Sequence, residues 1–124
     1  MQHFNELLKI NKEIIFEEDN VRTEKLDEVY QMLDNFYSKE FDLDEFIKLC
    51  IILFNMQLFY DGNSRTIITY FIKVINNQEY KFDYAKATDG LIKLKQLFPI
   101  MYDLNEELDD YDIFKLKQYI HLKK

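Results

Sequence analysis

The stretch that joins the two most apolar parts of this chain is Met56-Gln57-Leu58-Phe59-Tyr60-Asp61-Gly62-Asn63-Ser64-Arg65-Thr66-Ile67-Ile68. It holds the only glycine before residue 90. Asp61-Gly62-Asn63 is a turn signal, because glycine accepts a positive φ and the short Asp and Asn side chains bond to nearby backbone. Ser64 is a helix-capping residue type, so a helix is expected to begin at Ser64 or Arg65. The stretch therefore predicts a tight loop between two helices.

The predicted loop has the chemistry of an anion site. The first turn of the following helix would offer free backbone N–H groups and the positive end of the helix dipole. With Asn63 and the guanidinium of Arg65 beside them, these groups suit an anion, most naturally a phosphate. The alternative is an ordinary helix–loop–helix connection in which Asp-Gly-Asn serves turn geometry alone.

The two flanking segments are predicted to be buried helices. Asp42 caps the first, which is expected to run to about Phe59, with Asp44 in its first turn. The second is expected to run from Ser64 to about Asn76. Because both are apolar on nearly every side, other elements should surround them. We expect them to form the centre of a helical bundle.

The remaining chain adds further elements around this centre. Helical spacing of apolar residues predicts helices over 1–10, 23–37 and 84–98, and a last helix that starts at 109–112 and continues past Ile120. The basic end Lys123-Lys124 would then complement the negative end of that last helix. Tyr80-Lys81-Phe82 is expected to be extended, and Ile14-Ile15-Phe16 is either a short β-like extension or an irregular packed segment.

Composition limits the class of protein. The 124 residues have the size of one domain, and two glycines and one proline leave little punctuation for hairpins, which favours an all-α protein. A net charge of −7 opposes nucleic-acid binding. With Cys50 as the only cysteine, no internal disulfide can form, which fits a cytoplasmic protein with Cys50 as a buried hydrophobe. No signal peptide or membrane span is expected.

Residues 57–68 resemble the signature of the Fic (Fido) family, His-Pro-Phe-x-Asp/Glu-Gly-Asn-Gly-Arg-x-x-Arg. The positions that match in register are Phe59, Asp61, Gly62, Asn63 and Arg65. Gln57 replaces the histidine, Leu58 the proline, Ser64 the glycine and Ile68 the second arginine. The resemblance extends over residues 23–82, and it implies a single Fic-type helical domain over 1–124 with a short β-hairpin remnant near 13–16.

The resemblance also implies a nucleotide site, with ATP and Mg²⁺ as the usual ligands of active members. It makes Asp61 the metal-holding carboxylate, Asn63 a ligand of the α-phosphate and Arg65 a ligand of the distal phosphates. Gly62 and the amides of Ser64 and Arg65 would form the anion-binding backbone.

No catalytic residue is assigned, because Gln57 occupies the position of the family's general base. A carboxamide has no useful basicity near neutral pH, and Ile68 removes a phosphate-binding guanidinium. The sequence thus predicts a degenerate Fic-type protein, weak or inactive as an enzyme, that binds a partner protein and a nucleotide. One alternative is an active transferase that moves AMP or phosphate to a protein hydroxyl with a non-histidine base. Another is a helical interaction domain without a nucleotide site.

Overall fold

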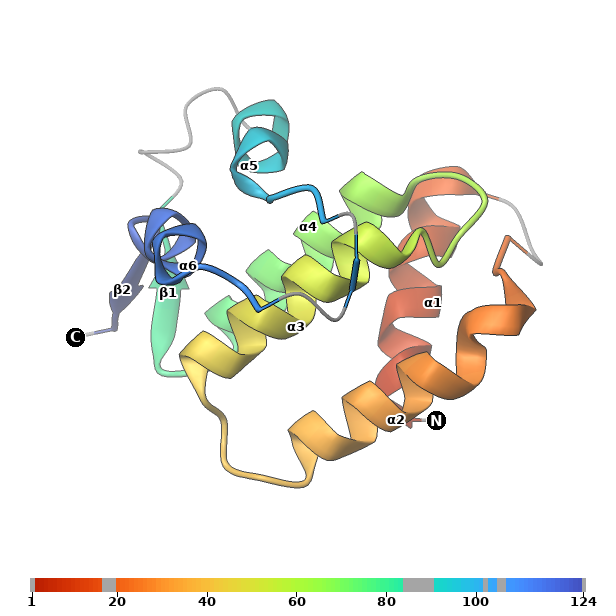
Figure 1. The fold of residues 1–124 in the computed structure, drawn as a ribbon, viewed down its shortest axis with the longest axis horizontal. Helices are drawn as coiled ribbons and strands as arrows, with labels where there is room; N and C mark the ends of the chain where they lie inside the picture. The colour runs from red at the N-terminus through yellow and green to blue at the C-terminus, as the bar shows by residue number, and fades with distance from the viewer. Residues whose placement is uncertain (1, 17–19, 84–90, 102, 105–106, 124) are drawn as a thin grey trace.

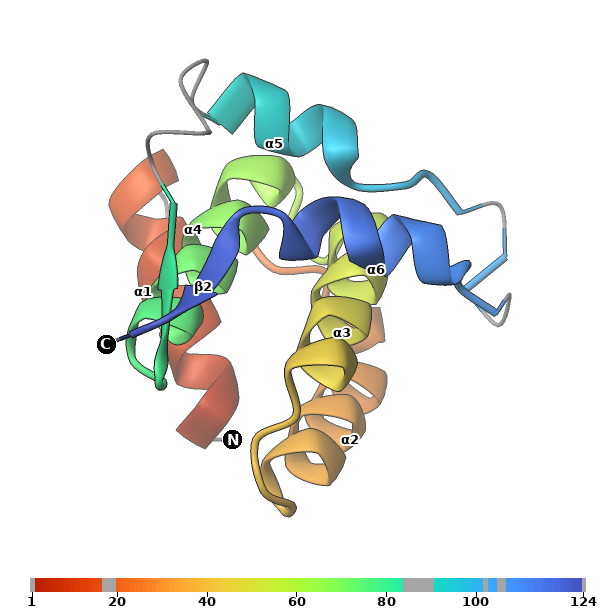
Figure 2. The ribbon, with the colours of Figure 1, turned by 90° about the vertical axis from the view of Figure 1, so that its left-hand side faces the viewer.

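The computed structural model describes residues 2–16, 20–83, 91–101, 103–104 and 107–123. Within these ranges the chain is mostly helical with one small two-stranded sheet, which confirms the all-α character (Figures 1 and 2). The elements are α1 (Gln2–Ile15), a 3-10 turn (Thr23–Lys25), α2 (Leu26–Tyr37), α3 (Leu43–Met56), α4 (Asn63–Asn76), β1 (Tyr80–Phe82), α5 (Leu91–Leu97), α6 (Asp110–Lys117) and β2 (Ile120–Leu122).

Helices α3 and α4 lie at the centre, as their apolar sequences predict. Helix α3 contacts α2, α4 and α6, while α4 contacts α1, α3, α5 and β1. Both bury side chains on more than one side, because neighbours cover them from several directions. The loop between them, residues 57–62, therefore leaves directly from the core.

Aromatic rings fill the space between the central helices and α5. Phe46 of α3 stacks on Phe71 of α4, with ring centroids 5.9 Å apart. Phe98, which follows α5, stacks on Phe54 of α3 at 4.8 Å and meets Phe71 edge-on at 5.8 Å. Ring pairs at these separations stabilise beyond the area that they bury. They hold the C-terminal end of α5 against α3 and α4.

The prediction of a β-hairpin remnant near residues 13–16 is wrong. Glu13–Ile15 form the last turn of α1, and Phe16 ends the helix in a left-handed conformation with φ 61°, its N–H donating to the Lys12 carbonyl at 2.8 Å. Helix is favoured over a hairpin here because Ile14 continues the apolar stripe of Leu7 and Ile10. The spacing of these residues places all three on the face of α1 that packs against α4 and α2.

The C-terminal residues form a strand where the sequence predicts helix. The last helix ends at Lys117, and β2 pairs antiparallel with β1, with Phe82 opposite Ile120. Tyr119 stacks on Phe82 at 5.9 Å, so its burial favours the strand pair over another helical turn. The extended conformation expected for Tyr80–Phe82 is confirmed.

Lys123 near the C-terminus interacts with the end of α4, and not with the end of the last helix as predicted. Lys123 donates from Nζ to the carbonyl of Asn76 at 2.5 Å, at the C-terminal end of α4. A cation there is favourable because the last carbonyls of a helix carry partial negative charge. The helix predicted over 84–98 is described from Leu91 onward, and its first residues, 84–90, lie outside the described part of the chain.

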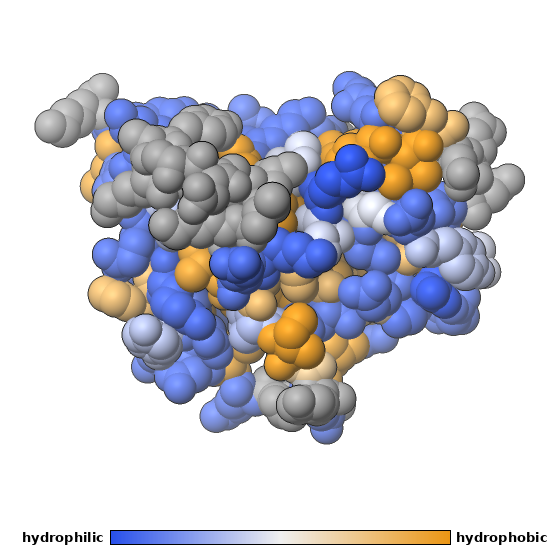
Figure 3. Space-filling view, turned by 90° about the horizontal axis from the view of Figure 1, so that it is seen from above, coloured by the Kyte–Doolittle hydropathy of each residue, from blue (hydrophilic) through white to orange (hydrophobic). Residues whose placement is uncertain are grey.

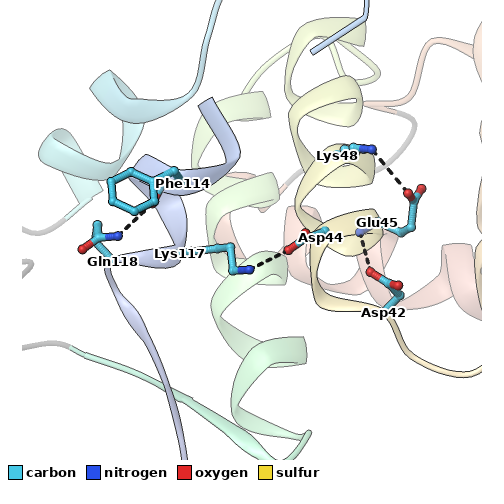
Figure 4. A network of polar contacts seen from close by, with 7 residues as sticks. All are labelled: Asp42, Asp44, Glu45, Lys48, Phe114, Lys117 and Gln118. Atoms are coloured by element: carbon cyan, nitrogen blue, oxygen red, sulfur yellow. Dashed lines mark hydrogen bonds and ion pairs between the residues drawn. The ribbon is translucent and has the colours of Figure 1, made fainter. Parts of the chain in front are cut away.

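Two caps set the start of α3 and of α6. Asp42 caps α3 as predicted, accepting from the Glu45 N–H at 3.1 Å (Figure 4). Asp109 caps α6 by accepting from the Tyr111 N–H at 3.0 Å. Helix α3 ends at Met56, three residues earlier than expected.

In the described ranges no helix has both the length and the apolar content that a bilayer crossing requires.

Candidate functional site

The loop after α3 begins with a sharp change of backbone direction at Gln57. This residue is left-handed, with φ 54° and ψ 51°, which ends the helix at Met56. Lys25 Nζ donates to the carbonyl of Met56 and so satisfies one of the last carbonyls of α3. The loop therefore starts from a fixed point, although glutamine is an uncommon residue type at positive φ.

The other end of the loop is Gly62, the N-cap of α4. Its φ of 78° suits glycine, and a Cβ there would lie 2.6 Å from Ile15 Cδ1. The first intrahelical bond runs from the Thr66 N–H to the Gly62 carbonyl at 3.0 Å, so α4 begins at Asn63. The cap expected from Ser64 is not made, because the helix starts one residue earlier.

Asn63 holds the loop closed with its side chain. Its Oδ1 accepts from the Phe59 N–H at 2.8 Å, and its Nδ2 donates to the Phe59 carbonyl at 2.6 Å and to Gln57 Oε1 at 3.3 Å. The residue is only 8% exposed. The amide is thus committed to the loop itself, and its predicted role as a phosphate ligand stays a prediction that would require it to give up one of these bonds.

A buried polar network supports the loop from behind. Asn11 Nδ2 donates to Thr66 Oγ1 at 3.0 Å and to the Asp61 carbonyl at 3.2 Å. Asn20 Nδ2 donates to Asn11 Oδ1 at 2.9 Å and to the same Asp61 carbonyl at 2.8 Å. Sequence reasoning missed this network, although one signal was present: Asn11 is a polar residue beside the buried apolar stripe of α1.

A short extended segment also pairs with the loop backbone. Val21 and Phe59 form an isolated antiparallel bridge, flanked by hydrogen bonds from the Arg22 N–H to Leu58 and from the Tyr60 N–H to Asn20, both 2.8 Å. The Arg22 guanidinium lies over the Tyr60 ring, 4.6 Å from its centroid. The backbone of residues 58–60 is therefore hydrogen-bonded both to the Asn63 side chain and to the backbone of residues 20–22.

The predicted site residues line one open pocket of about 480 Å³. The lining residues are Gln57, Tyr60, Asp61, Gly62, Asn63, Ser64, Arg65, Ile68 and Lys95. Eight of these nine come from the loop and the start of α4, and Lys95 comes from α5. Seen from above in Figure 3, the end of the molecule that carries α5 mixes hydrophilic side chains with separate apolar patches.

The charged side chains among the described lining residues are two cations and one carboxylate. Arg65 and Lys95 are exposed, and neither forms an ion pair with another residue in the described part of the chain. Asp61 is the carboxylate among these described residues. Positive charge prevails here although the whole chain has 16 basic and 23 acidic residues. The arrangement is suited to an anion.

Asp61 is the residue predicted to hold a metal ion. Its Oδ1 accepts from the Gly62 N–H at 2.8 Å, and its other carboxylate oxygen has no hydrogen bond within the described ranges. No cluster of three or more His, Cys, Asp or Glu side chains that could hold a metal ion occurs among the residues described. One carboxylate is enough for Mg²⁺ that arrives with phosphates and water, so Asp61 fits a nucleotide-borne ion better than a resident one.

The described residues that line the pocket include no histidine or cysteine that could start group transfer. Gln57 is exposed, and its Nε2 donates to the Phe54 carbonyl at 3.4 Å while its Oε1 accepts from Asn63. Cys50 is completely buried in α3, and this burial raises the pKa of its thiol well above the usual range. The prediction that Cys50 is a packed hydrophobe is therefore confirmed, since a reactive thiol needs access and a lowered pKa.

Neither the models of known protein families nor the curated proteins nor the solved structures give a match to this chain. The Fic resemblance thus rests on the sequence alone, chiefly on the five matching residues between 59 and 65. The function has to be argued from the geometry of the pocket.

Proposed function

We propose that this protein binds the phosphate groups of a nucleotide in the pocket at residues 57–65, as a degenerate Fic-type protein that does not transfer them efficiently. One observation carries the proposal: Gly62, Ser64 and Arg65, singled out from sequence for anion binding, line a single pocket with a second cation from another helix. A nucleotide is a ligand class that joins several anionic groups to a flat aromatic base.

The backbone at the start of α4 supports phosphate binding. The N–H groups of Ser64 and Arg65 precede the first intrahelical bond of a 14-residue helix. They therefore have no partner within the helix, and the helix dipole adds partial positive charge at this end. The pocket volume of about 480 Å³ lies within the range of small-molecule sites, roughly 300 to 1,000 Å³.

The residue at position 57 is the reason to expect binding without efficient transfer. A glutamine side chain can orient a hydroxyl but cannot accept its proton at neutral pH. General-base assistance is worth roughly 10² to 10⁴ in rate, so losing it leaves at most slow chemistry. We propose that the protein acts by binding a protein target or regulator. Tyr60, an aromatic residue of the pocket wall that is 60% exposed, would contact that partner.

One observation favours a second candidate, a helical interaction domain without a nucleotide site. The Asn63 side-chain amide already hydrogen-bonds to Phe59 and Gln57. Such bonds are expected of a loop whose residues serve turn geometry alone. The two candidates differ in whether the pocket binds phosphate at all.

Titration calorimetry with ATP and ADP, each with and without Mg²⁺, separates the two candidates. The proposal expects saturable binding below millimolar ligand, and Arg65→Ala should weaken it about tenfold or more through the lost charge-assisted hydrogen bonds. Lys81→Ala is the matched control, because Lys81 is exposed on β1 and does not line the pocket. The absence of any binding at millimolar ligand would leave the interaction domain as the account.

The catalytic half is tested with labelled ATP and cell lysate. The wild-type protein should label no protein above background, and Gln57→His should restore labelling if only the base has been lost. Labelling by the wild type that disappears in Arg65→Ala would show an active transferase with a non-histidine base.

A further inference from the structure

We propose that Lys95 is a second phosphate-binding residue, and that it makes the pocket selective for ligands with two linked phosphates over a single phosphate. The ligand class is then a nucleoside diphosphate or triphosphate. This inference rests on the proposed function and specifies the ligand of the same site.

The backbone of Lys95 is held in place by its neighbours in the core. Leu94 and Phe98 are buried, with 1% and 3% of their surfaces exposed. Phe98 packs its ring against Phe54 of α3 and Phe71 of α4. Helix α5 thereby lies across α4 (Figures 1 and 2), and Lys95 is presented to the loop from a fixed position.

Lys95 has no role in the fold that would explain its charge at this place. It is exposed, it lines the pocket with Arg65, and it forms no ion pair within the described ranges. Among the exposed lysines described, Lys73 pairs with Glu6 and Lys117 pairs with Asp44. Lys9, Lys12, Lys39 and Lys81 form no ion pair in these ranges either, so what distinguishes Lys95 is that it lines the same pocket as Arg65. Two cations that line one pocket raise the positive potential there, and this favours an anion as the ligand.

The charge count of the pocket shows why Lys95 matters. Among the described lining residues, Arg65 and Lys95 together with Asp61 give a formal charge of +1, whereas Arg65 and Asp61 alone give zero. Without Lys95, the negative charge of Asp61 would offset the positive charge of Arg65, and these two side chains would give no net attraction for an anion. The pocket attracts an anion through its side chains only if both cations contribute.

Two cations from two helices suit two phosphates. The planar guanidinium of Arg65 can grip one phosphate with paired hydrogen bonds, and the ammonium of Lys95 is a point charge on a long flexible stem that can follow a neighbouring phosphate. A single phosphate can satisfy Arg65 but offers no second group to Lys95. The preference for linked phosphates follows from this division of contacts.

The test is calorimetry with inorganic phosphate, pyrophosphate and ADP on four proteins: wild type, Lys95→Gln, Lys95→Arg and Lys81→Gln. Lys95→Gln should weaken pyrophosphate and ADP about tenfold, the worth of one charged hydrogen bond, and should affect phosphate much less. Lys95→Arg should keep most of the affinity, and Lys81→Gln should match the wild type. The comparison of pyrophosphate with ADP shows whether the nucleoside adds affinity.

The failure of this inference differs from the failure of the proposed function. If the wild type binds none of the three ligands, the proposed function fails and the inference falls with it. If the wild type binds them but Lys95→Gln behaves like Lys81→Gln, or loses phosphate and pyrophosphate equally, the inference on Lys95 is overturned while phosphate binding stands. Thermal melts of each variant confirm that exposed substitutions have left the fold intact.

Discussion

Gly62 lies where the loop meets α1, and its small size allows that approach. A Cβ at this position would lie 2.6 Å from Ile15 Cδ1 and 2.8 Å from Ile15 Cγ1. The φ of 78° adds strain for any residue with a side chain. A glycine at the start of α4 is thus required by contact and by backbone conformation together.

We predict that Gly62→Ala lowers the free energy of unfolding by about 1 to 3 kcal/mol, from backbone strain and the clash with Ile15. Urea denaturation measures the change. In an Ile15→Ala background the cost of Gly62→Ala should be smaller, because the clashing atoms are gone. An equal cost in both backgrounds would show that the contact with Ile15 does not matter.

The residues of the pocket could be predicted from sequence only where they are consecutive. Asp61 to Arg65 follow one another at the end of the loop and the start of α4, and local turn and cap chemistry is enough to group them. Lys95 lines the pocket from α5, and Asn11 and Asn20 bind the Asp61 carbonyl from other parts of the chain, so only tertiary contacts reveal them. The hydrogen bonds of Asn63 to Phe59 were equally invisible, because residue type alone does not show which partner an amide chooses.

Helices α2 and α4 are joined by a pair of tyrosines, of which Tyr70 is buried and Tyr37 is half-buried. The hydroxyl groups of Tyr37 and Tyr70 lie 2.5 Å apart. Burial raises the pKa of both phenols, and for Tyr70 the nearby Tyr37, Cys50 and Glu6 raise it further. The folded state therefore keeps both hydroxyl groups protonated at a pH where the unfolded chain releases its protons.

The raised pKa of Tyr70 predicts a loss of stability in alkali. A folded-state pKa above the unfolded value gives stability that is complete below about pH 10, the ordinary pKa of tyrosine, and is lost as the pH rises beyond it. The free energy of unfolding, measured by urea denaturation from pH 8 to 11, should fall more steeply above about pH 10 in the wild type than in Tyr70→Phe. Parallel curves would contradict a role for Tyr70.

Helix α6 is joined to α3 by an exposed ion pair between Lys117 and Asp44, 2.9 Å long (Figure 4), and it also buries Leu116 completely. We predict that Leu116→Ala lowers the free energy of unfolding by about 2 to 5 kcal/mol, because it leaves a cavity. Lys117→Ala should cost less than about 1 kcal/mol, since water screens an exposed pair. Thermal and urea unfolding of both variants measure this order, and a larger effect of Lys117→Ala would contradict it.

The elements that sequence predicts best are those with long apolar periodicity. The central helices are recognisable because they are apolar on most sides. Residues 13–16 and 120–122 are short, and short apolar runs suit helix and strand alike. Contacts with α4 settle the first as helix, and pairing with β1 settles the second as strand.

At the scale of the whole molecule, one hydrophobic core joins all six described helices to the loop. The buried cluster includes Phe4 of α1, Val29 of α2, Leu94 of α5 and Leu116 of α6, together with Leu58 and Phe59 of the loop itself. The loop that lines the pocket is therefore packed into the hydrophobic core. The excess of positive charge among the described lining residues contrasts with the chain's net charge of −7.

The most direct test of the central claim is the place where a phosphate ligand binds. In an NMR titration of the isotope-labelled protein with ADP and Mg²⁺, the backbone amides of Gly62, Ser64 and Arg65 should show the largest saturable shifts. The groove between α2 and α3, lined by Met32 and Leu49 among others, serves as the internal control and should stay unchanged. Shifts confined to that groove, or no shift of the loop amides at saturating ligand, would contradict the account.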